Sequence, residues 1–171
     1  VENPAGQQVL EALTRLGWRL SQEQVQFRNT VVIDLSPGAE AILAGMKQKT
    51  RYNIRLASRK GISVRHAGEE DFPALYRLYA ETSVRDGFVI RERDYYLELW
   101  SRFLQAGMLT PLAAVFDDKI IAGLMLFHFA GHAWYIHGMS ADEQREKMPN
   151  YLLQWEAIQT AASLGCKTYD L

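Results

Sequence analysis

The sequence has little of what marks a secreted, metal-stapled or membrane-spanning protein. Its 171 residues include one cysteine, Cys166, so an internal disulfide and a zinc site of paired cysteines are both excluded. The 19 basic and 20 acidic residues give a net charge of −1, which excludes binding of polyanions through overall charge. The one candidate membrane segment, residues 120–136, contains two histidines and is shorter than the roughly 20 apolar residues that a spanning helix needs.

What remains is the composition of a globular domain, with 48% hydrophobic and 11% aromatic residues. These fractions exclude disordered, collagen-like and coiled-coil chains. The chain starts without Met or a signal peptide, and residues 168–171 have the pattern of a strand that is just beginning. We therefore expect an excerpt of a longer protein. The single cysteine is typical of a reducing compartment, and we expect a cytoplasmic location.

Hydrophobic periodicity and turn residues predict an alternation of helices and strands. Gly17, Gly61 and Gly165 stand where helices should end, and Pro149 stands where one should begin. The predicted helices are 7–16, 39–60, 69–84, 93–105 and 149–164, and the predicted strands are 25–35, 62–65, 112–116, 120–129, 133–139 and a last one from 168.

The short links 117–119 and 130–132 predict two hairpins, and therefore an antiparallel meander from about residue 111 to residue 139. The helix after it returns the chain by a crossover, which makes the last strand parallel to one strand of the sheet. The fold class is therefore α/β, a mixed sheet with a crevice where a parallel and an antiparallel strand part. This strand order fits the GNAT acyltransferase fold, which we expect to be incomplete at both ends.

The loop 141–150 bears on the acyl donor. In GNAT enzymes a glycine-rich segment before the central helix offers backbone N–H groups to the pyrophosphate of coenzyme A. Here the segment has no glycine, three acidic residues and a proline that removes one donor. The fold therefore indicates acyl transfer, whereas the loop argues against acetyl-CoA. The chain also lacks HExxH and GxSxG motifs, and we expect neither a metal nor a cofactor.

Two clusters of cations could bind phosphate or carboxylate groups. Residues 47–60 contain six cations and no acid, with Arg51, Arg55 and Arg59 four apart on one helix face. Like charges at this spacing repel one another. Either the face is solvated and compensated by acids, or it contacts phosphate groups of a ligand or nucleic acid. The second cluster includes Arg91 and Tyr95, where a guanidinium beside a phenol suits a diphosphate or carboxylate, and surface salt bridging is the alternative.

Four blocks of the sequence resemble the Fem (FemABX) peptidoglycan-bridge aminoacyltransferases. The blocks follow the family's order, and the resemblance covers residues 30–171. They are residues 49–61 (KTRYNIRLASRKG), residues 81–96 with Arg91, Tyr95 and Tyr96, residues 133–140 (AWYIHGMS) and residues 149–156 (PNYLLQWE).

The resemblance implies a tandem of two GNAT-like domains. Residues 1–60 would be the tail of the first domain and a basic linking helix, and residues 61–171 the second domain without its C-terminal part. The implied activity moves an amino acid from aminoacyl-tRNA to the peptide of a UDP-linked or lipid-linked muramyl precursor, in cell-wall biogenesis and the maintenance of cell shape. No DNA partner and no transmembrane segment are implied, and peripheral contact with the inner membrane surface is allowed.

The resemblance also implies roles for residues. Arg91, Tyr95 and Tyr135 match positions that bind the precursor, and we expect all three to converge on one crevice. The basic helix would offer contacts to tRNA or phosphate. The family's catalytic lysine falls beyond residue 171, so the catalytic residue is not assigned and the 171-residue piece alone should be inactive. The proposed tRNA or phosphate contacts are Lys49, Arg51, Arg55 and Arg59.

Two other functions stay open at this point. One is a GNAT N-acyltransferase that uses acetyl-CoA or another acyl donor. The other is a GNAT-like module that binds a ligand without catalysis. The sequence names neither the transferred amino acid nor the acceptor.

Overall fold

The structure is a computed structural model that describes residues 4–19, 21, 23 and 29–171. It contains two compact units, residues 1–30 and 31–171. The first unit contains helix α1 (Pro4–Arg15), which matches the predicted helix 7–16 and its end before Gly17. Of the predicted strand 25–35, residues 25–28 lie outside the described residues, and the described part contains only the short strand β1 (Val32–Asp34).

The second unit is built on a six-stranded mixed sheet with the order β1-β6-β5-β4-β3-β2. Every neighbouring pair is antiparallel except β5 and β6, which are parallel. This confirms the predicted meander and the parallel last strand. The remaining strands are β2 (Ser63–His66), β3 (Leu109–Phe116), β4 (Lys119–Phe129), β5 (His132–Ser140) and β6 (Thr168–Asp170).

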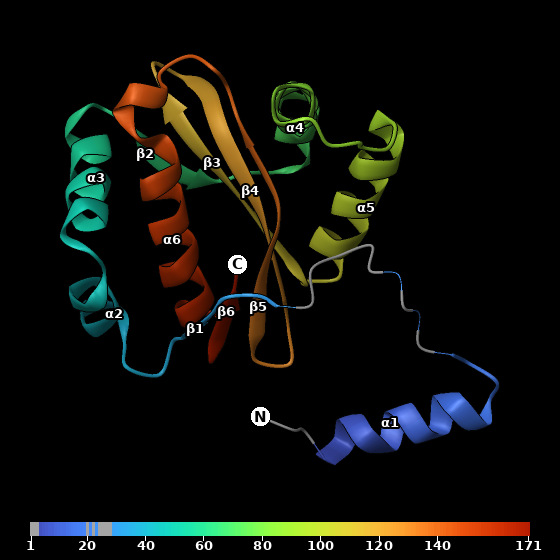
Figure 1. Cartoon of the computed structure of the whole chain (residues 1–171). Coiled ribbons are helices and arrows are strands. Elements are labelled where there is room, and N and C mark those ends of the chain that lie inside the picture. Colours follow the sequence, from blue (N-terminus) through green and yellow to red (C-terminus); the bar gives the residue numbers. More distant parts are fainter. Residues whose placement is uncertain (1–3, 20, 22, 24–28) are drawn as a thin grey trace. The chain divides into compact units, whose positions relative to one another are not determined.

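Helices cover both faces of the sheet (Figure 1). One face carries α2 (Ala39–Gly45), α3 (Gln48–Arg59) and α6 (Pro149–Ser163). The opposite face carries α4 (Phe72–Asp86) and α5 (Arg93–Gln105), and the short 3-10 turns η1 (Glu69–Asp71) and η2 (Arg145–Lys147) precede α4 and α6. None of the helices in the described residues has the length and apolar character needed to cross a bilayer.

Side chains alternate along the central strands and so divide the core into two clusters. On β4, Leu124 and Leu126 face α3 and α6, whereas Met125 and Phe127 face α4 and α5. The second cluster is centred on Trp100, which is completely buried. The α/β class and the GNAT-like sheet predicted from the sequence are thus observed.

The region predicted as one helix over 39–60 is two helices. Met46 and Lys47 between them have extended backbone, with ψ angles of 152° and 145°. The Arg51 side chain donates hydrogen bonds to the carbonyls of Ala44 (2.9 Å) and Met46. Carbonyls at a helix end lack intrahelical partners, so the guanidinium stabilises this break.

The compact unit begins earlier than the predicted domain boundary after residue 60. Ile54 and Ala57 of α3 are buried in the same cluster as Leu152 and Ile158 of α6. Helix α3 is therefore part of the unit that contains the sheet, and the observed division is at residues 30 and 31. The assignment of the chain to the ends of two GNAT-like domains stays a prediction.

Candidate functional site

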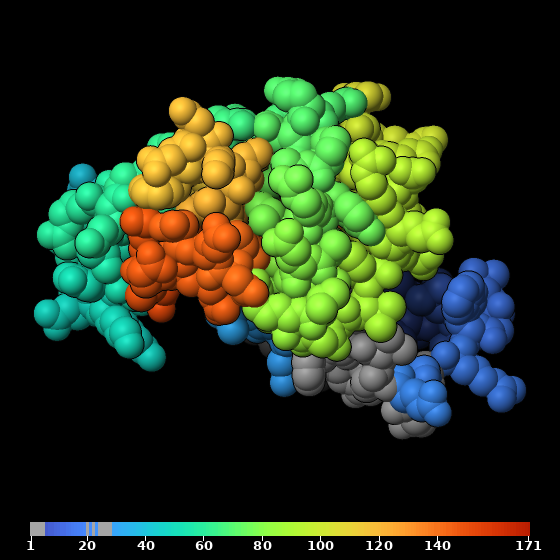
Figure 2. Space-filling model, turned by 90° about the horizontal axis from the view of Figure 1, so that it is seen from above, coloured from blue at the N-terminus to red at the C-terminus, as the bar shows by residue number. Residues whose placement is uncertain are grey.

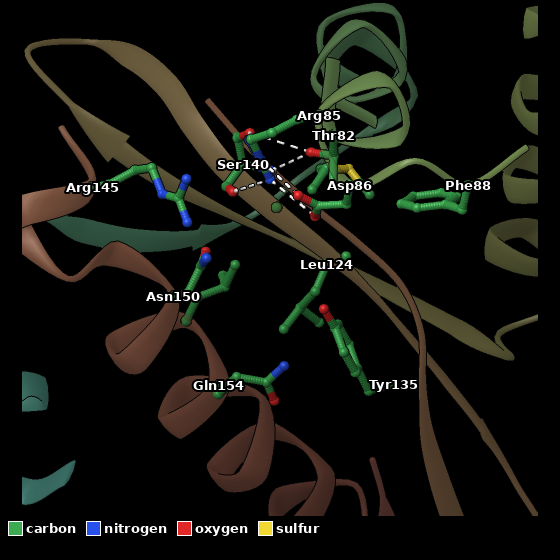
Figure 3. A pocket seen from close by; sticks show the side chains of 14 residues that line it. Thr82, Arg85, Asp86, Phe88, Leu124, Tyr135, Ser140, Arg145, Asn150 and Gln154 are labelled. Atoms are coloured by element: carbon green, nitrogen blue, oxygen red, sulfur yellow. Dashed lines mark hydrogen bonds and ion pairs between the residues drawn. The ribbon is translucent and has the colours of Figure 1, made fainter. Parts of the chain in front are cut away.

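A cavity of about 330 Å³ lies where β5 extends beyond its pairing with β6. The two strands pair only over residues 132–134 and 168–170, whereas β5 continues to Ser140. This is the crevice predicted from the mixed sheet. The cavity is drawn in Figure 3, and its lining residues come from the end of α4, from β4 and β5, and from the start of α6: Thr82, Arg85, Asp86, Phe88, Gly123, Leu124, Tyr135, Gly138, Met139, Ser140, Arg145, Asn150, Leu153 and Gln154.

A β-bulge in β5 shapes the wall of this cavity. Met125 pairs with His137 and Leu126 pairs with Tyr135, so Ile136 is the extra residue. The bulge places Tyr135 and Gly138 on one face, although they are three apart in sequence. A Cβ atom on residue 138 would lie 1.7 Å from the Tyr135 hydroxyl oxygen. Glycine at 138 is therefore what allows the phenol to lie over the strand.

Arg85 ties the end of α4 to the end of β5. Its Nη1 donates to the carbonyl of Ser140 at 2.8 Å and to Asp142 Oδ1 at 3.0 Å, and its Nε donates to Asp86 Oδ1 at 2.9 Å. The Thr82 hydroxyl accepts from the Ser140 N–H at 3.0 Å, and its one proton is shared between the carbonyls of Leu78 and Ser140. These bonds fix the upper wall of the cavity, and most of the Arg85 donors are thereby used.

Gln154 on α6 lines the cavity, and its amide is bonded to a buried phenol that is not part of the lining. Tyr169 on β6 is completely buried and donates to Gln154 Oε1 at 2.6 Å. Burial raises the pKa of Tyr169 and of Tyr135, so both phenols keep their protons at neutral pH. The cavity thus offers hydroxyl and amide donors together with the Arg145 guanidinium.

The loop between β5 and α6 borders the cavity and contains η2. Gln144 and Met148 have positive φ angles of 63° and 61°, a conformation that costs energy for residues other than glycine. Pro149 is the first residue of α6 and has no N–H to donate. In the observed structure, as in the sequence, this loop is a poor cradle for a pyrophosphate.

Arg91 and Tyr95 come together, but Tyr135 lies apart from them. The Arg91 guanidinium carbon is 4.8 Å from the centre of the Tyr95 ring, and the hydroxyls of Tyr76 and Tyr96 bond the Arg91 backbone. Neither Arg91 nor Tyr95 lines the cavity. Tyr135 packs on the face covered by α6, whereas Arg91 and Tyr95 adjoin the face covered by α4 and α5. The expected convergence of the three is therefore corrected, because the strand directs Tyr135 to the other face.

The cations of α3 differ in what they contact. Arg51 is turned back to the carbonyls at the end of α2, whereas Lys49, Arg55 and Arg59 are exposed. The Arg59 guanidinium carbon lies 5.8 Å from the centre of the Tyr52 ring. In the described part of the chain none of the six cations between 47 and 60 forms an ion pair, so compensation by acids of the following domain is not observed.

A groove of about 410 Å³ runs beside these cations, between α3 and α6, and it is lined by Arg55, Arg59, Trp155 and Glu156 among others. Figure 2 shows the neighbouring end of the molecule, where the segment before α6 lies between α3 and α4. The groove and the cavity are both lined by residues of the first half of α6.

Three of the four strand histidines have ordinary side-chain hydrogen-bond partners. His128 bonds Thr110 at 3.1 Å, His132 bonds Thr168 at 2.7 Å, and His137 Nδ1 accepts from Trp100 Nε1 at 3.1 Å. Burial lowers the pKa of His137 to about 4, so it is neutral at pH 7. Within the residues that the structure describes, no three His, Cys, Asp or Glu side chains are placed to hold a metal ion.

Sequence reasoning missed most of the cavity residues. Thr82, Asn150 and Gln154 lie within the blocks that resemble the Fem enzymes, but nothing in their spacing sets them apart from solvated positions. Arg85, Asp86 and Phe88 belong to the same cationic cluster as Arg91 and Tyr95, and of that cluster they are the residues that line the cavity. They meet because a bulge and a crossover bring distant segments together. Only the blocks themselves could have pointed to them.

Comparisons with known proteins agree on a family and a fold. A profile of the FemAB family matches residues 1–118. The lipid II:glycine glycyltransferase of Staphylococcus haemolyticus is 21% identical over 241 residues, which covers 99% of this chain and 58% of that protein. The chain thus spans little more than half the length of such relatives.

Two solved structures share the fold. The crystal structure of FemX matches with a TM-score of 0.84 and 18% identity, covering 97% of this chain and 60% of that one. A predicted acetyltransferase with acetyl-CoA, from Clostridium acetobutylicum, matches with a TM-score of 0.55 and 12% identity, covering 63% of this chain and 78% of that one. At these identities the matches show the fold alone.

Proposed function

The chain belongs to the FemAB family, and from this premise we propose that the intact protein transfers an amino acid from aminoacyl-tRNA to the peptide of a peptidoglycan precursor. The observation that carries the proposal is the cavity at the parting of β5 and β6, with its hydroxyl, amide and guanidinium donors. In open α/β sheets, ligands bind in the crevice where the strand order changes in this way. The loop beside it is not built for coenzyme A, which favours another donor.

The acceptor that we propose is a lipid-linked muramyl peptide, with the UDP-linked form as the alternative. The name of the relatives, lipid II:glycine glycyltransferase, favours the lipid-linked form and makes glycine the first amino acid to test. The reaction would take place in the cytoplasm, at the inner surface of the membrane. Its product would be a peptide branch for the cell-wall bridge.

We assign the substrate contacts by where the structure places each residue. Arg91 and Tyr95 would bind the anionic part of the precursor, since their guanidinium and phenol form one exposed pair. Tyr135 would contact the reacting end of a substrate in the cavity. Lys49 and the arginines 55 and 59 would contact tRNA phosphates, whereas Arg51 has its donors on backbone carbonyls.

The chemistry requires little beyond placement. The amine of the precursor peptide attacks the ester carbonyl of the aminoacyl-tRNA, and hydrogen-bond donors stabilise the negative charge that develops on the carbonyl oxygen. Holding two large anionic substrates in one geometry supplies much of the rate. The assignment of the catalytic lysine to a segment after residue 171 stays a prediction.

Binding measurements with the intact protein distinguish an aminoacyl-tRNA donor from an acetyl-CoA donor. We expect an acceptor-stem RNA to bind with an affinity that falls steeply with salt, because phosphate contacts release counterions. Coenzyme A should show no binding at millimolar concentration by isothermal titration. Coenzyme A binding together with salt-independent RNA binding would instead favour the acetyltransferase alternative.

A pair of double variants then tests whether the cations of α3 contact the RNA. Arg55→Ala with Arg59→Ala should weaken RNA binding and reduce the slope of log K against log salt by about 1.4 to 1.8, since each phosphate contact contributes about 0.7–0.9. The control, Arg102→Ala with Lys167→Ala, removes two positive charges outside α3 and should leave the slope nearly unchanged. Equal slopes for both double variants would exclude α3 as the RNA contact.

A further inference from the structure

The side-chain amide of Gln154 has a fixed direction. Its Oε1 accepts the 2.6 Å hydrogen bond from Tyr169, which is completely buried and so cannot turn toward water. An amide carries an acceptor oxygen at one end and two N–H donors at the other. With the oxygen held by Tyr169, the two donors must point away from β6. Figure 3 shows the amide nitrogen on the side of the cavity that faces Leu124 and the Tyr135 hydroxyl.

The wall opposite Gln154 presents a hydroxyl. The Tyr135 phenol lies over Gly138, and the described residues offer neither its hydroxyl nor the Gln154 Nε2 a hydrogen-bond partner. Leu124 and Leu153 also line the cavity, beside these two polar groups. A hydroxyl and an amide N–H that face the same space are what a small group with one acceptor oxygen would satisfy.

We propose that the Gln154 Nε2 binds the carbonyl oxygen of the acyl group that is transferred, with Tyr169 as the residue that orients the amide. This rests on the proposed function, which supplies an ester carbonyl as the reacting group. Gln154 is then a residue that touches the reacting atoms, and Tyr169 is a positioning residue that acts through it.

Gln154 would assist the attack of the amine on the ester carbonyl. The amine nitrogen forms a bond to the carbonyl carbon, and the carbonyl electron pair moves onto the oxygen that faces Nε2. When the carbonyl re-forms, the bond to the ribose oxygen breaks, and that oxygen leaves with the electron pair and takes up one proton lost by the amine. A donor placed at the carbonyl oxygen stabilises the intermediate more than the ester, so it raises kcat more than it lowers KM.

Three variants of the intact protein test the assignment in a transfer assay with glycyl-tRNA and a lipid-linked precursor. Gln154→Glu keeps the size of the side chain and an oxygen for Tyr169 but replaces the donors with acceptors. We expect kcat to fall by about 10²–10³-fold, with KM for glycyl-tRNA changed less than threefold. Tyr169→Phe should lower kcat less, and a double variant should be no worse than Gln154→Glu alone, because both act through one group.

The control is Gln159→Glu, on the same helix and outside the cavity. If Gln154→Glu and Gln159→Glu have kcat values within threefold of each other while the wild type is active, the proposal is overturned and the proposed function stands. A loss that appears only in KM would also overturn it, because that is the effect of lost ground-state binding.

A second readout covers the case in which the wild type transfers nothing from glycyl-tRNA, so that the proposed function fails. The Gln154 side-chain N–H signals are then followed by NMR during titration with 3′-glycylamino-3′-deoxyadenosine, a stable carbonyl probe. A shift of the Gln154 signals with those of Gln159 unmoved supports carbonyl binding at Nε2. Unmoved Gln154 signals overturn it.

Discussion

His137 is a neutral imidazole buried among aromatic rings, with the rings of Tyr79, Tyr96 and Phe127 5.3–5.8 Å from its own. Its Nδ1 accepts from the Trp100 indole, so protonation at this nitrogen would break a hydrogen bond as well as bury a charge. Burial lowers the pKa of His137 to about 4, against an ordinary value of about 6.5. The unfolded chain therefore binds more protons than the folded one between these two values.

This difference predicts that His137 makes stability depend on pH. Its contribution is fully present above pH 6.5 and is lost as the pH falls toward 4, by up to about 3 kcal/mol. Gln at this position keeps an acceptor for Trp100 but does not titrate. Urea unfolding of wild type and His137→Gln at pH 7, 5.5 and 4.5 should show the free-energy gap between them shift in favour of the variant at low pH. A gap that is constant with pH would refute the burial of a neutral imidazole.

Gly123 decides how closely α4 approaches the sheet. It lies on β4, and a Cβ atom there would come within 2.3 Å of Leu75 Cδ2 and 3.3 Å of the Leu112 carbonyl. Leu75 is completely buried, so it has little room to yield. Gly123→Ala should lower the free energy of unfolding by about 1–3 kcal/mol through overpacking.

The control for Gly123→Ala is Gly45→Ala at the end of α2, where the added Cβ atom would meet nothing within 4 Å. It should be neutral or stabilise the protein by up to about 1 kcal/mol, since alanine is the better helix former. Chemical denaturation measures both variants. Equal stability of the two would mean that α4 does not pack against β4 as described.

Arg51 and Arg55 give a matched pair at the junction of α2 and α3. Arg51→Ala should destabilise the protein by about 1–2 kcal/mol, because it leaves the carbonyls of Ala44 and Met46 without their charged donor. Arg55→Ala should cost less than about 0.5 kcal/mol, since its side chain is exposed and bonds a single carbonyl at 3.2 Å. Reversed magnitudes, measured by thermal or urea unfolding, would show that Arg51 is not what holds the break between the helices.

At the scale of the molecule, the sequence predicted the sheet well because its signals are local. Short links at 117–119 and 130–132 specify hairpins, and Pro149 marks the start of α6 where it is observed. The break at residues 46 and 47 was missed because its one sequence signal is Gly45, the last residue of α2, and because a side chain of the following helix, Arg51, stabilises it.

The site was harder to predict because it depends on long-range geometry. The crevice itself followed from the strand order, but its walls join residues 82–88 with residues 135–154. The bulge at Ile136 sets the face on which Tyr135 lies, and a bulge of one residue leaves no clear trace in hydrophobic alternation. Arg91, which lies just before α5, and Tyr95 in the first turn of α5 were paired correctly because they are close together in the sequence.

The most direct test of the account uses the intact protein, glycyl-tRNA and a lipid-linked muramyl pentapeptide, with the product followed by mass spectrometry. The account predicts that the precursor gains the mass of one glycine residue in an RNase-sensitive reaction. Acetyl-CoA supplied in place of the charged tRNA should give no product. Acetylation of the precursor by acetyl-CoA, with no product from any aminoacyl-tRNA, would contradict it.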